Sequence, residues 1–223
     1  KDIKDKMVEF ETGMEKLVLW EDHQEHQKKL KKLFRISKGN ADEMFHPNVL
    51  VDKIKFDNSA HYKVIILVTS FAKYFEHRQW IRKAWGNQTF WNESVENWQV
   101  IFNVGAVDSA EVQQKLVEES KNHGDMLILD VPENFHKLSE KVMAGLYWVY
   151  TKFSFEFVFK TDDDVFIHMQ RLLTKLNTTW SQENYVGNRN YNAVPRRNKG
   201  RYGVSSKEWP GKYYDPYCSG GGY

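Results

Sequence analysis

Residues 157–167 read FVFKTDDDVFI, which places three adjacent aspartates between two apolar segments. We refer to Asp162, Asp163 and Asp164 as the aspartate run. Like charges this close together repel, and the apolar flanks predict a buried strand rather than a solvated surface. A positive group should therefore balance the run: either a basic side chain such as Lys160, which can pair with Asp162, or a bound cation.

Short apolar segments precede the run along the chain, separated by stretches with helical periodicity. The strands are expected at residues 64–68, 100–104, 126–131 and 155–159, and the helices at 78–85, 110–120 and 138–150. This alternation predicts an α/β fold with a mostly parallel sheet covered by helices on both faces. Because the aspartate run directly follows the fourth strand, we expect it at the carboxyl edge of the sheet, where ligands of such folds bind.

The composition of the whole chain limits the classes of function. Of the 223 residues 41% are hydrophobic, which is enough to bury the core of one globular domain with an appendage. The 32 basic and 30 acidic side chains nearly cancel, which argues against nucleic acid as a partner. The longest aliphatic run is Val64–Val68, far shorter than the roughly 20 residues of a membrane-spanning helix.

The first 58 residues are rich in charge and differ from the rest. Early apolar positions are spaced as in a heptad seam: Ile3, Met7, Phe10, Met14 and Leu17. The seam ends there, so we expect a helical stem or lead-in segment over residues 1–58, with a dimerising coiled coil as the alternative. Residues 59–223 are expected to form the functional domain, and we expect the chain to be a fragment cut at both ends.

The aspartate run offers ligands for a hard cation. If the backbone stays extended, Asp162 and Asp164 point to one side and Asp163 to the other. Two carboxylates are what Mg²⁺ or Mn²⁺ accepts from a protein when water and substrate phosphates fill its remaining positions. The sequence therefore predicts a metal that holds a diphosphate. A solvated acidic cluster, or an ion pair between Lys160 and Asp162, is the alternative.

Five motifs in a fixed order carry a family resemblance. They are RQWIRKAWG (78–86), HGDMLILDV (123–131), KLSEK (137–141), FVFKTDDDVFI (157–167) and YYDPYCSGGGY (213–223). From about Lys63 to its end the chain resembles the β-1,3-glycosyltransferase family, which includes β-1,3-galactosyltransferases, β-1,3-N-acetylglucosaminyltransferases and, more distantly, fringe.

The resemblance implies a GT-A-type nucleotide-sugar fold with a Rossmann-like half, so residues 59–223 would be a catalytic domain that is incomplete at its C-terminal end. It also implies metal-dependent, inverting transfer of a sugar from a UDP-sugar to a hydroxyl of a glycan acceptor on a glycoprotein or glycolipid. Galactose is the favoured sugar and N-acetylhexosamine the alternative. A non-catalytic glycan-binding relative is a second reading, and a metal-dependent phosphoryl hydrolase, suggested by the carboxylates alone, is a third.

The resemblance implies a location as well. Relatives are single-pass Golgi membrane proteins with a luminal catalytic domain, so we expect a signal-anchor upstream of Lys1. Three acceptor triplets for N-glycosylation agree with a secretory compartment: Asn87, Asn92 and Asn177. The family disulfide is not expected, because Phe153 occupies a position at which relatives often carry cysteine.

Carried onto this chain, the family's donor site falls on residues of three motifs. Asp164 matches the direct metal ligand, while Asp162 either joins it on Mn²⁺ or faces the ribose of the donor; Asp163 is assigned to the donor as well. Arg78 and Arg82 share a helical face and are expected either to contact the donor or to pair with a buried carboxylate. Lys141 is expected to contact the donor or to support the fold.

The acceptor and the catalytic base are less well defined. Trp209 and Tyr217 belong to an aromatic patch that either stacks on sugar rings or is a loop packed on the core. The basic stretch 196–201 either favours an acidic acceptor or is a solvated loop. We assign no residue as the base: the family's acidic motif comes after CSGGGY, so we expect it beyond Tyr223. His168 is expected to be a surface or helix-capping residue.

Overall fold

The fold is described by a computed structural model, which covers residues 48–223 apart from 58, 92–96, 180–184 and 198–199. Most of the expected stem, with its heptad seam, lies outside these residues, as does the acceptor triplet at Asn92. None of the helices in the described ranges is long and apolar enough to cross a membrane.

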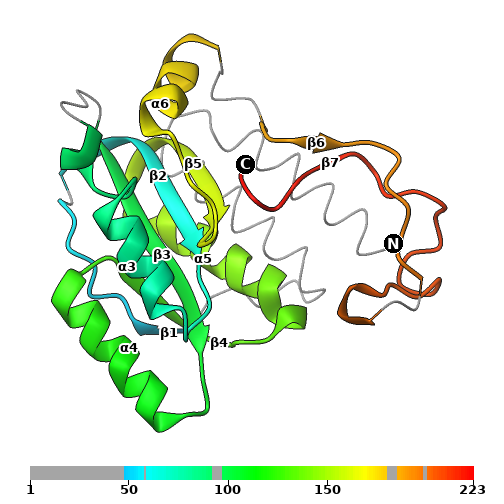
Figure 1. The fold of residues 1–223 in the computed structure, drawn as a ribbon, viewed down its shortest axis with the longest axis horizontal. Helices are drawn as coiled ribbons and strands as arrows, with labels where there is room; N and C mark the ends of the chain where they lie inside the picture. The colour runs from blue at the N-terminus through cyan, green and yellow to red at the C-terminus, as the bar shows by residue number, and fades with distance from the viewer. Residues whose placement is uncertain (1–47, 58, 92–96, 180–184, 198–199) are drawn as a thin grey trace.

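A five-stranded sheet forms the centre of the molecule (Figure 1). Its strands are β1 (Val49–Val51), β2 (His61–Thr69), β3 (Trp98–Ala106), β4 (Met126–Pro132) and β5 (Ser154–Asp162). Their order is β1-β4-β3-β2-β5, in which β2 to β5 run parallel and β1 pairs with β4 antiparallel. The predicted parallel sheet is confirmed, and the sheet also includes β1, which precedes the expected domain boundary at residue 58.

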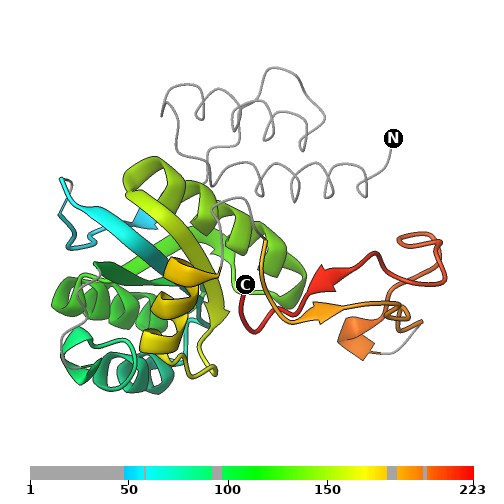
Figure 2. The same cartoon turned by 90° about the horizontal axis from the view of Figure 1, so that it is seen from above.

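Both faces of the sheet are buried, which is why its strands are apolar throughout. On one face, Val64, Ile66 and Val68 of β2 pack with residues of α3 (Phe75–Lys83), α4 (Ala110–His123) and α6 (Met169–Thr178). On the other, Ile65 and Leu67 pack with residues of α5 (Leu138–Lys152). Figure 2 shows the helices on opposite sides of the sheet.

Local signals set the ends of the helices. The Ser109 side chain accepts a hydrogen bond from the backbone N–H of Val112 at the start of α4, and Gly124 ends this helix with φ +68°. The imidazole of His168 caps α6 in the same way by accepting from the backbone N–H of Arg171. The expectation that His168 is a helix-capping residue is confirmed.

Residues 185–223, which we call the C-terminal arm, extend beside the sheet (Figures 1 and 2). The arm contains η3 (Gly200–Tyr202) and a short antiparallel pair, β6 (Arg189–Asn190) and β7 (Tyr217–Cys218). Its last residue returns to β5: Tyr223 exchanges two backbone hydrogen bonds with Lys160, of 2.7 and 3.0 Å. Two further short helices, η1 (Gln88–Trp91) and η2 (Phe135–Lys137), lie in loops around the sheet.

Candidate functional site

The aspartate run lies at the carboxyl edge of the sheet, as predicted. However, β5 ends at Asp162, and Asp163 and Asp164 form part of a turn. The alternation expected for an extended backbone is therefore wrong from Asp163 onward, and each carboxylate has its own environment.

Asp162 takes part in an ion pair that the sequence left open. Lys160 Nζ lies 2.6 Å from Asp162 Oδ1 and donates to the carbonyl oxygen of Gly220, also at 2.6 Å. The Lys160 side chain is buried, whereas that of Asp162 is 38% exposed. The lysine thus offsets one charge of the run and ties β5 to the C-terminal arm, while the carboxylate remains accessible to a ligand.

Asp163 turns inward. Its Oδ2 accepts a hydrogen bond of 2.6 Å from Ser70 Oγ, just past the end of β2, and its Oδ1 lies 3.4 Å from Nδ1 of His77 on α3. Only 9% of the side chain is exposed. Asp163 therefore connects the turn after β5 to β2 and α3, and this arrangement favours a positioning role over direct contact with a donor.

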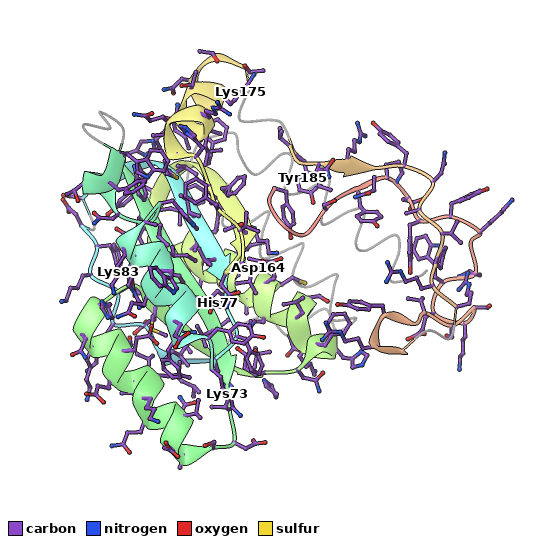
Figure 3. The ribbon with its side chains drawn as sticks, viewed as in Figure 1. Lys73, His77, Lys83, Asp164, Lys175 and Tyr185 are labelled. Carbon is purple, nitrogen blue, oxygen red and sulfur yellow. The ribbon has the colours of Figure 1, made fainter. Side chains whose placement is uncertain are left out.

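Asp164 is the outward member of the run. It is exposed, and within the described part of the chain no basic side chain forms an ion pair with it. Figure 3 shows Asp164 at the edge of the sheet beyond β5. An exposed carboxylate with no cationic partner, next to an accessible Asp162, is a suitable ligand for a cation.

The residues present fit a cation that is shared with a substrate. Across residues 48–223, where described, no group of three or more His, Cys, Asp or Glu side chains could enclose a metal. Mg²⁺ and Mn²⁺ do not need such a cage, because one or two carboxylates suffice when substrate phosphates complete the coordination. Asp162 and Asp164 would hold the ion.

Arg78 lies inside the protein. Its side chain is fully buried, and its guanidinium donates to both carboxylate oxygens of Glu119, to Ser70 Oγ and to the carbonyl oxygens of Phe71 and Ala72. These bonds engage all five N–H groups of a guanidinium. Of the two roles expected for Arg78, the structure displays the pair with a buried carboxylate.

Arg82 extends this network. Its Nε and Nη2 donate to the two oxygens of Asp125 at 2.7 and 2.8 Å, and its Nη1 donates to Glu119 at 2.6 Å. Burial alone would raise the pKa of Glu119, but the hydrogen bonds and charges of both arginines hold it below its usual value. Burial would likewise lower the pKa of Arg82, and its two carboxylate partners raise it instead.

Lys141 is buried at the same edge of the sheet. Its Nζ lies 3.0 Å from each carboxylate oxygen of Glu133 and donates to the carbonyl oxygen of Ser70 at 3.1 Å. These contacts show Lys141 supporting the fold, which is the second of the two roles expected for it.

Ser70 links these groups, and the sequence reading missed it. Its hydroxyl accepts from Arg78 at 3.0 Å and donates to Asp163, while its carbonyl accepts from Lys141. The signal was available, because Ser70 is a polar residue directly after a buried strand, as the aspartate run is. Glu119 gave no such signal, since it is one of several acidic residues on α4.

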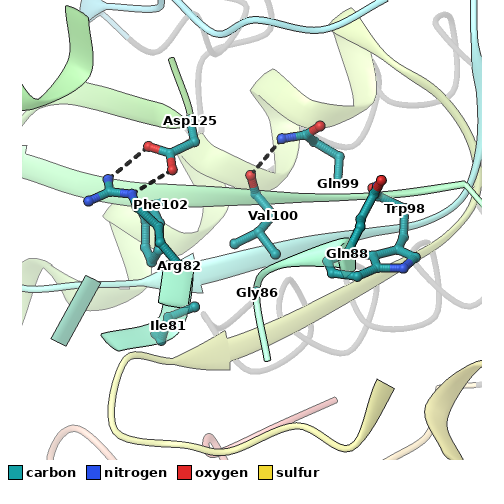
Figure 4. Close-up of a pocket in the computed structure, with 9 residues that line it drawn as sticks. All are labelled: Ile81, Arg82, Gly86, Gln88, Trp98, Gln99, Val100, Phe102 and Asp125. Atoms are coloured by element: carbon teal, nitrogen blue, oxygen red, sulfur yellow. Dashed lines mark hydrogen bonds and ion pairs between the residues drawn. The ribbon is translucent and has the colours of Figure 1, made fainter. Parts of the chain in front are cut away.

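A cavity of about 240 Å³ lies away from the aspartate run, between α3 and the first half of β3 (Figure 4). Its lining includes Ile81, Gly86, Trp98 and Phe102, with the Arg82–Asp125 pair as its charged part. None of the three aspartates contributes to it. The cavity is smaller than usual small-molecule sites, so the carboxyl edge remains the better candidate.

The two residues expected to bind the acceptor lie together in the C-terminal arm. The rings of Trp209 and Tyr214 are 5.2 Å apart, and those of Tyr214 and Tyr217 are 6.2 Å apart. Trp209 Nε1 donates to the carbonyl oxygen of Tyr213 at 3.0 Å, so the indole is fixed from within the arm. Tyr217 remains 39% exposed and available for stacking.

Two of the acceptor triplets are described. The Asn87 side chain accepts hydrogen bonds from the backbone N–H and hydroxyl of Thr89, at 3.0 and 2.9 Å. Asn177 is exposed near the end of α6. Their glycosylation stays a prediction.

Comparisons with known proteins agree on one family. A family model described as galactosyltransferase matches residues 76–223. Beta-1,3-galactosyltransferase 5 of Mus musculus is 35% identical over 167 residues, which cover 72% of this chain and 52% of the mouse protein. The human protein of the same name is 33% identical over 166 residues, or 72% of this chain and 52% of its own.

A relative named for a different sugar also matches. Lactosylceramide 1,3-N-acetyl-beta-D-glucosaminyltransferase A of Xenopus laevis is 27% identical over 208 residues, which cover 82% of this chain and 55% of the frog protein. The chain thus spans about half the length of the curated relatives it matches.

Proposed function

Because this chain belongs to the galactosyltransferase family, we propose that it is part of a metal-dependent, inverting β-1,3-glycosyltransferase that moves galactose from UDP-galactose to a hydroxyl of a glycan. The name of the frog relative supports N-acetylglucosamine as the alternative sugar. The observation that carries the proposal is the exposed Asp164, which stands at the carboxyl edge of the sheet with no cationic partner among the described residues.

The members of the aspartate run divide between two tasks in this mechanism. Asp164 and the exposed part of Asp162 would bind Mn²⁺ or Mg²⁺, which would offset the negative charge on the departing diphosphate. Asp163 would hold the turn in place through Ser70 and His77. Lys160 would limit the repulsion within the run before the ligand binds, because it offsets the charge of Asp162.

Arg78 and Arg82 act indirectly. The network of Arg78, Glu119 and Arg82 fixes Ser70, whose hydroxyl in turn donates a hydrogen bond to Asp163 and holds that carboxylate in place. We therefore assign these residues to the support of the site rather than to donor contact. We assign no catalytic base to any residue of the chain.

A thermal shift experiment tests the donor site. UDP-galactose, UDP-N-acetylglucosamine and UDP-N-acetylgalactosamine are added to the chain, each with and without Mn²⁺. We expect UDP-galactose with Mn²⁺ to raise the melting temperature most, since a ligand that binds only the folded state stabilises it. The variant Asp164→Asn should lose this shift, whereas Glu111→Gln, on the exposed face of α4, should keep it. The proposal fails if no UDP-sugar gives a metal-dependent shift.

We also propose that the protein acts on glycoproteins or glycolipids in the Golgi lumen, held there by a membrane anchor. The acceptor triplets support a secretory location, and Asn177 is exposed. Expression in a secreting eukaryotic cell, followed by treatment with a glycosidase that removes N-linked glycans, should increase the mobility of the protein. Asn177→Gln should reduce that change, and a mobility that the enzyme leaves unaltered would contradict this location.

A further inference from the structure

The C-terminal arm carries a concentrated positive charge that the donor site does not use. Residues 185–223 contain seven lysines and arginines but two aspartates and glutamates, a net charge of +5, whereas the whole chain has +2. A local excess of this size attracts anionic partners to one surface and repels cationic ones.

Within the arm, the basic side chains have different roles. Arg197 is structural, because its guanidinium donates to the carbonyl oxygens of Val204, Ser205 and Gly211 at 3.3, 3.0 and 2.8 Å. Arg196 and Arg201 are exposed, and neither forms an ion pair in the part of the chain that the structure describes.

These two arginines stack on two exposed rings. The guanidinium carbon of Arg201 lies 4.8 Å from the ring centroid of Tyr202 and 5.4 Å from that of Phe135, and that of Arg196 lies 5.7 Å from Tyr202. We call Phe135, Arg196, Arg201 and Tyr202 the arginine–aromatic cluster. Stacking of this kind orients a guanidinium and leaves its edge free to bind an anion.

The cluster joins two distant parts of the chain. Phe135 belongs to η2, which follows β4 at the carboxyl edge of the sheet, whereas Tyr202 belongs to η3 in the arm. Their rings meet edge to face at 5.0 Å, yet 41% of Phe135 and 46% of Tyr202 remain exposed. The cluster therefore presents aromatic faces and two guanidinium groups at the carboxyl edge of the sheet, where the aspartate run also lies.

Within the described ranges of the chain, no carboxylate forms an ion pair with either arginine of the cluster. Glu208 accepts hydrogen bonds from the backbone N–H and hydroxyl of Ser205, at 2.8 and 2.7 Å, and so is held within its own turn. Arg201 Nη2 donates to the hydroxyl of Tyr202 at 2.7 Å, and none of the described residues takes a hydrogen bond from its remaining N–H groups.

We propose that the arginine–aromatic cluster binds an anionic sugar of the acceptor glycan, with the guanidinium groups on its carboxylate or sulfate and the rings against its pyranose face. The inference rests on the proposed function, because that function supplies the glycan acceptor. An anionic group engages arginine in paired, charge-assisted hydrogen bonds, and the exposed rings give the sugar a surface that a bare polyanion would not use.

Direct binding tests this inference without turnover. Isothermal titration of the chain at moderate salt compares an uncharged lactosamine oligosaccharide with its sialylated and sulfated forms. We expect at least one acidic form to bind about tenfold more tightly than the neutral one, which corresponds to about 1.4 kcal/mol, and its advantage to shrink as salt increases. Preference for the sialylated form identifies a carboxylate, and preference for the sulfated form a sulfate ester.

Three variants separate the cluster from the general charge of the arm. The double change Arg196→Gln and Arg201→Gln should abolish the preference for the acidic form. Lys207→Gln removes one positive charge from the arm outside the cluster and should leave the preference intact. Phe135→Ala should weaken the binding of both the neutral and the acidic ligands.

Equal affinity for neutral and acidic forms would overturn the proposal, as would an equal loss in the Lys207→Gln control. It would also fail if a sugar-free polyanion of similar charge bound as tightly as the acidic glycan. The metal-dependent thermal shift with UDP-galactose, measured on the same variants, distinguishes this failure from that of the proposed function. If the thermal shift persists while the preference for the acidic glycan is absent, only the proposal for the arginine–aromatic cluster is contradicted.

Discussion

The buried pairing of Arg78 with Glu119 gives a sharp test of how the carboxyl edge is supported. Glu119→Gln keeps the shape of the side chain but removes the charge that faces two arginines. Arg78 then remains fully buried without an ionised partner, since its other contacts are two carbonyl oxygens and the hydroxyl of Ser70. Breaking one side of a buried ion pair costs about 3–5 kcal/mol. We expect the free energy of unfolding to fall by about 3 kcal/mol, because the amide oxygen still accepts one hydrogen bond.

Urea unfolding at neutral pH, followed by tryptophan fluorescence, measures this loss as a lower midpoint with an unchanged slope. Glu111→Gln is the matched control: it removes a carboxylate from the same helix, but its pair with Lys115 lies on the surface and should contribute little. If Glu119→Gln unfolds at the same urea concentration as the control, Arg78 is not held as described. Donor contact, the other role expected for Arg78, would then become the better assignment.

Three further outcomes follow from neighbouring contacts. Gly145→Ala should lower the melting temperature and cost about 1–3 kcal/mol in chemical unfolding, because an added Cβ would lie 2.4 Å from the buried amide of Asn103; an unchanged melting temperature would contradict the packing of α5 on β3. Ser70→Ala should lower the free energy of unfolding by about 1–3 kcal/mol, because it leaves buried hydrogen-bond partners unsatisfied. It should also weaken UDP-sugar binding in thermal shift assays by displacing Asp163, and normal donor binding would argue against the link between Ser70 and the donor site. The folded-state pKa of Glu119 lies below its ordinary value of 4.5, so its contribution to stability is present above that pH and is lost as the pH falls through the lowered pKa. In unfolding series down to pH 3, the stability of Glu119→Gln should therefore fall less steeply than that of the unaltered chain. Parallel stability curves would contradict the lowered pKa of Glu119.

The strands and their order along the chain were predictable because burial on both faces requires apolar residues throughout. Residues 64–68 and 126–131 match β2 and β4 within a few residues, and the helix expected at 138–150 is α5. β1 escaped prediction because it has three residues, with one exposed, and so carries no periodic signal. The C-terminal arm was also beyond reach, because β6 and β7 have two residues each and the return of Tyr223 to Lys160 joins distant parts of the chain.

For the site, position was predictable but orientation was not. The carboxyl-edge rule placed the aspartate run correctly, yet the turn after Asp162 sends Asp163 inward to Ser70, 93 positions away in the sequence. The partners of Arg78 could not be read from the sequence either. Glu119 lies 41 positions downstream on another helix, and only the packing of that helix beside α3 brings the charges together.

If the proposed function holds, Asp164 binds a divalent cation together with a nucleotide diphosphate. Electron paramagnetic resonance measures free Mn²⁺ directly while UDP is titrated into the chain, into Asp164→Asn and into the control Glu111→Gln. We expect the chain and the control to take up Mn²⁺ only when UDP is present, and Asp164→Asn to take up none above the level of UDP alone. Uptake by Asp164→Asn equal to that of the unaltered chain would contradict it.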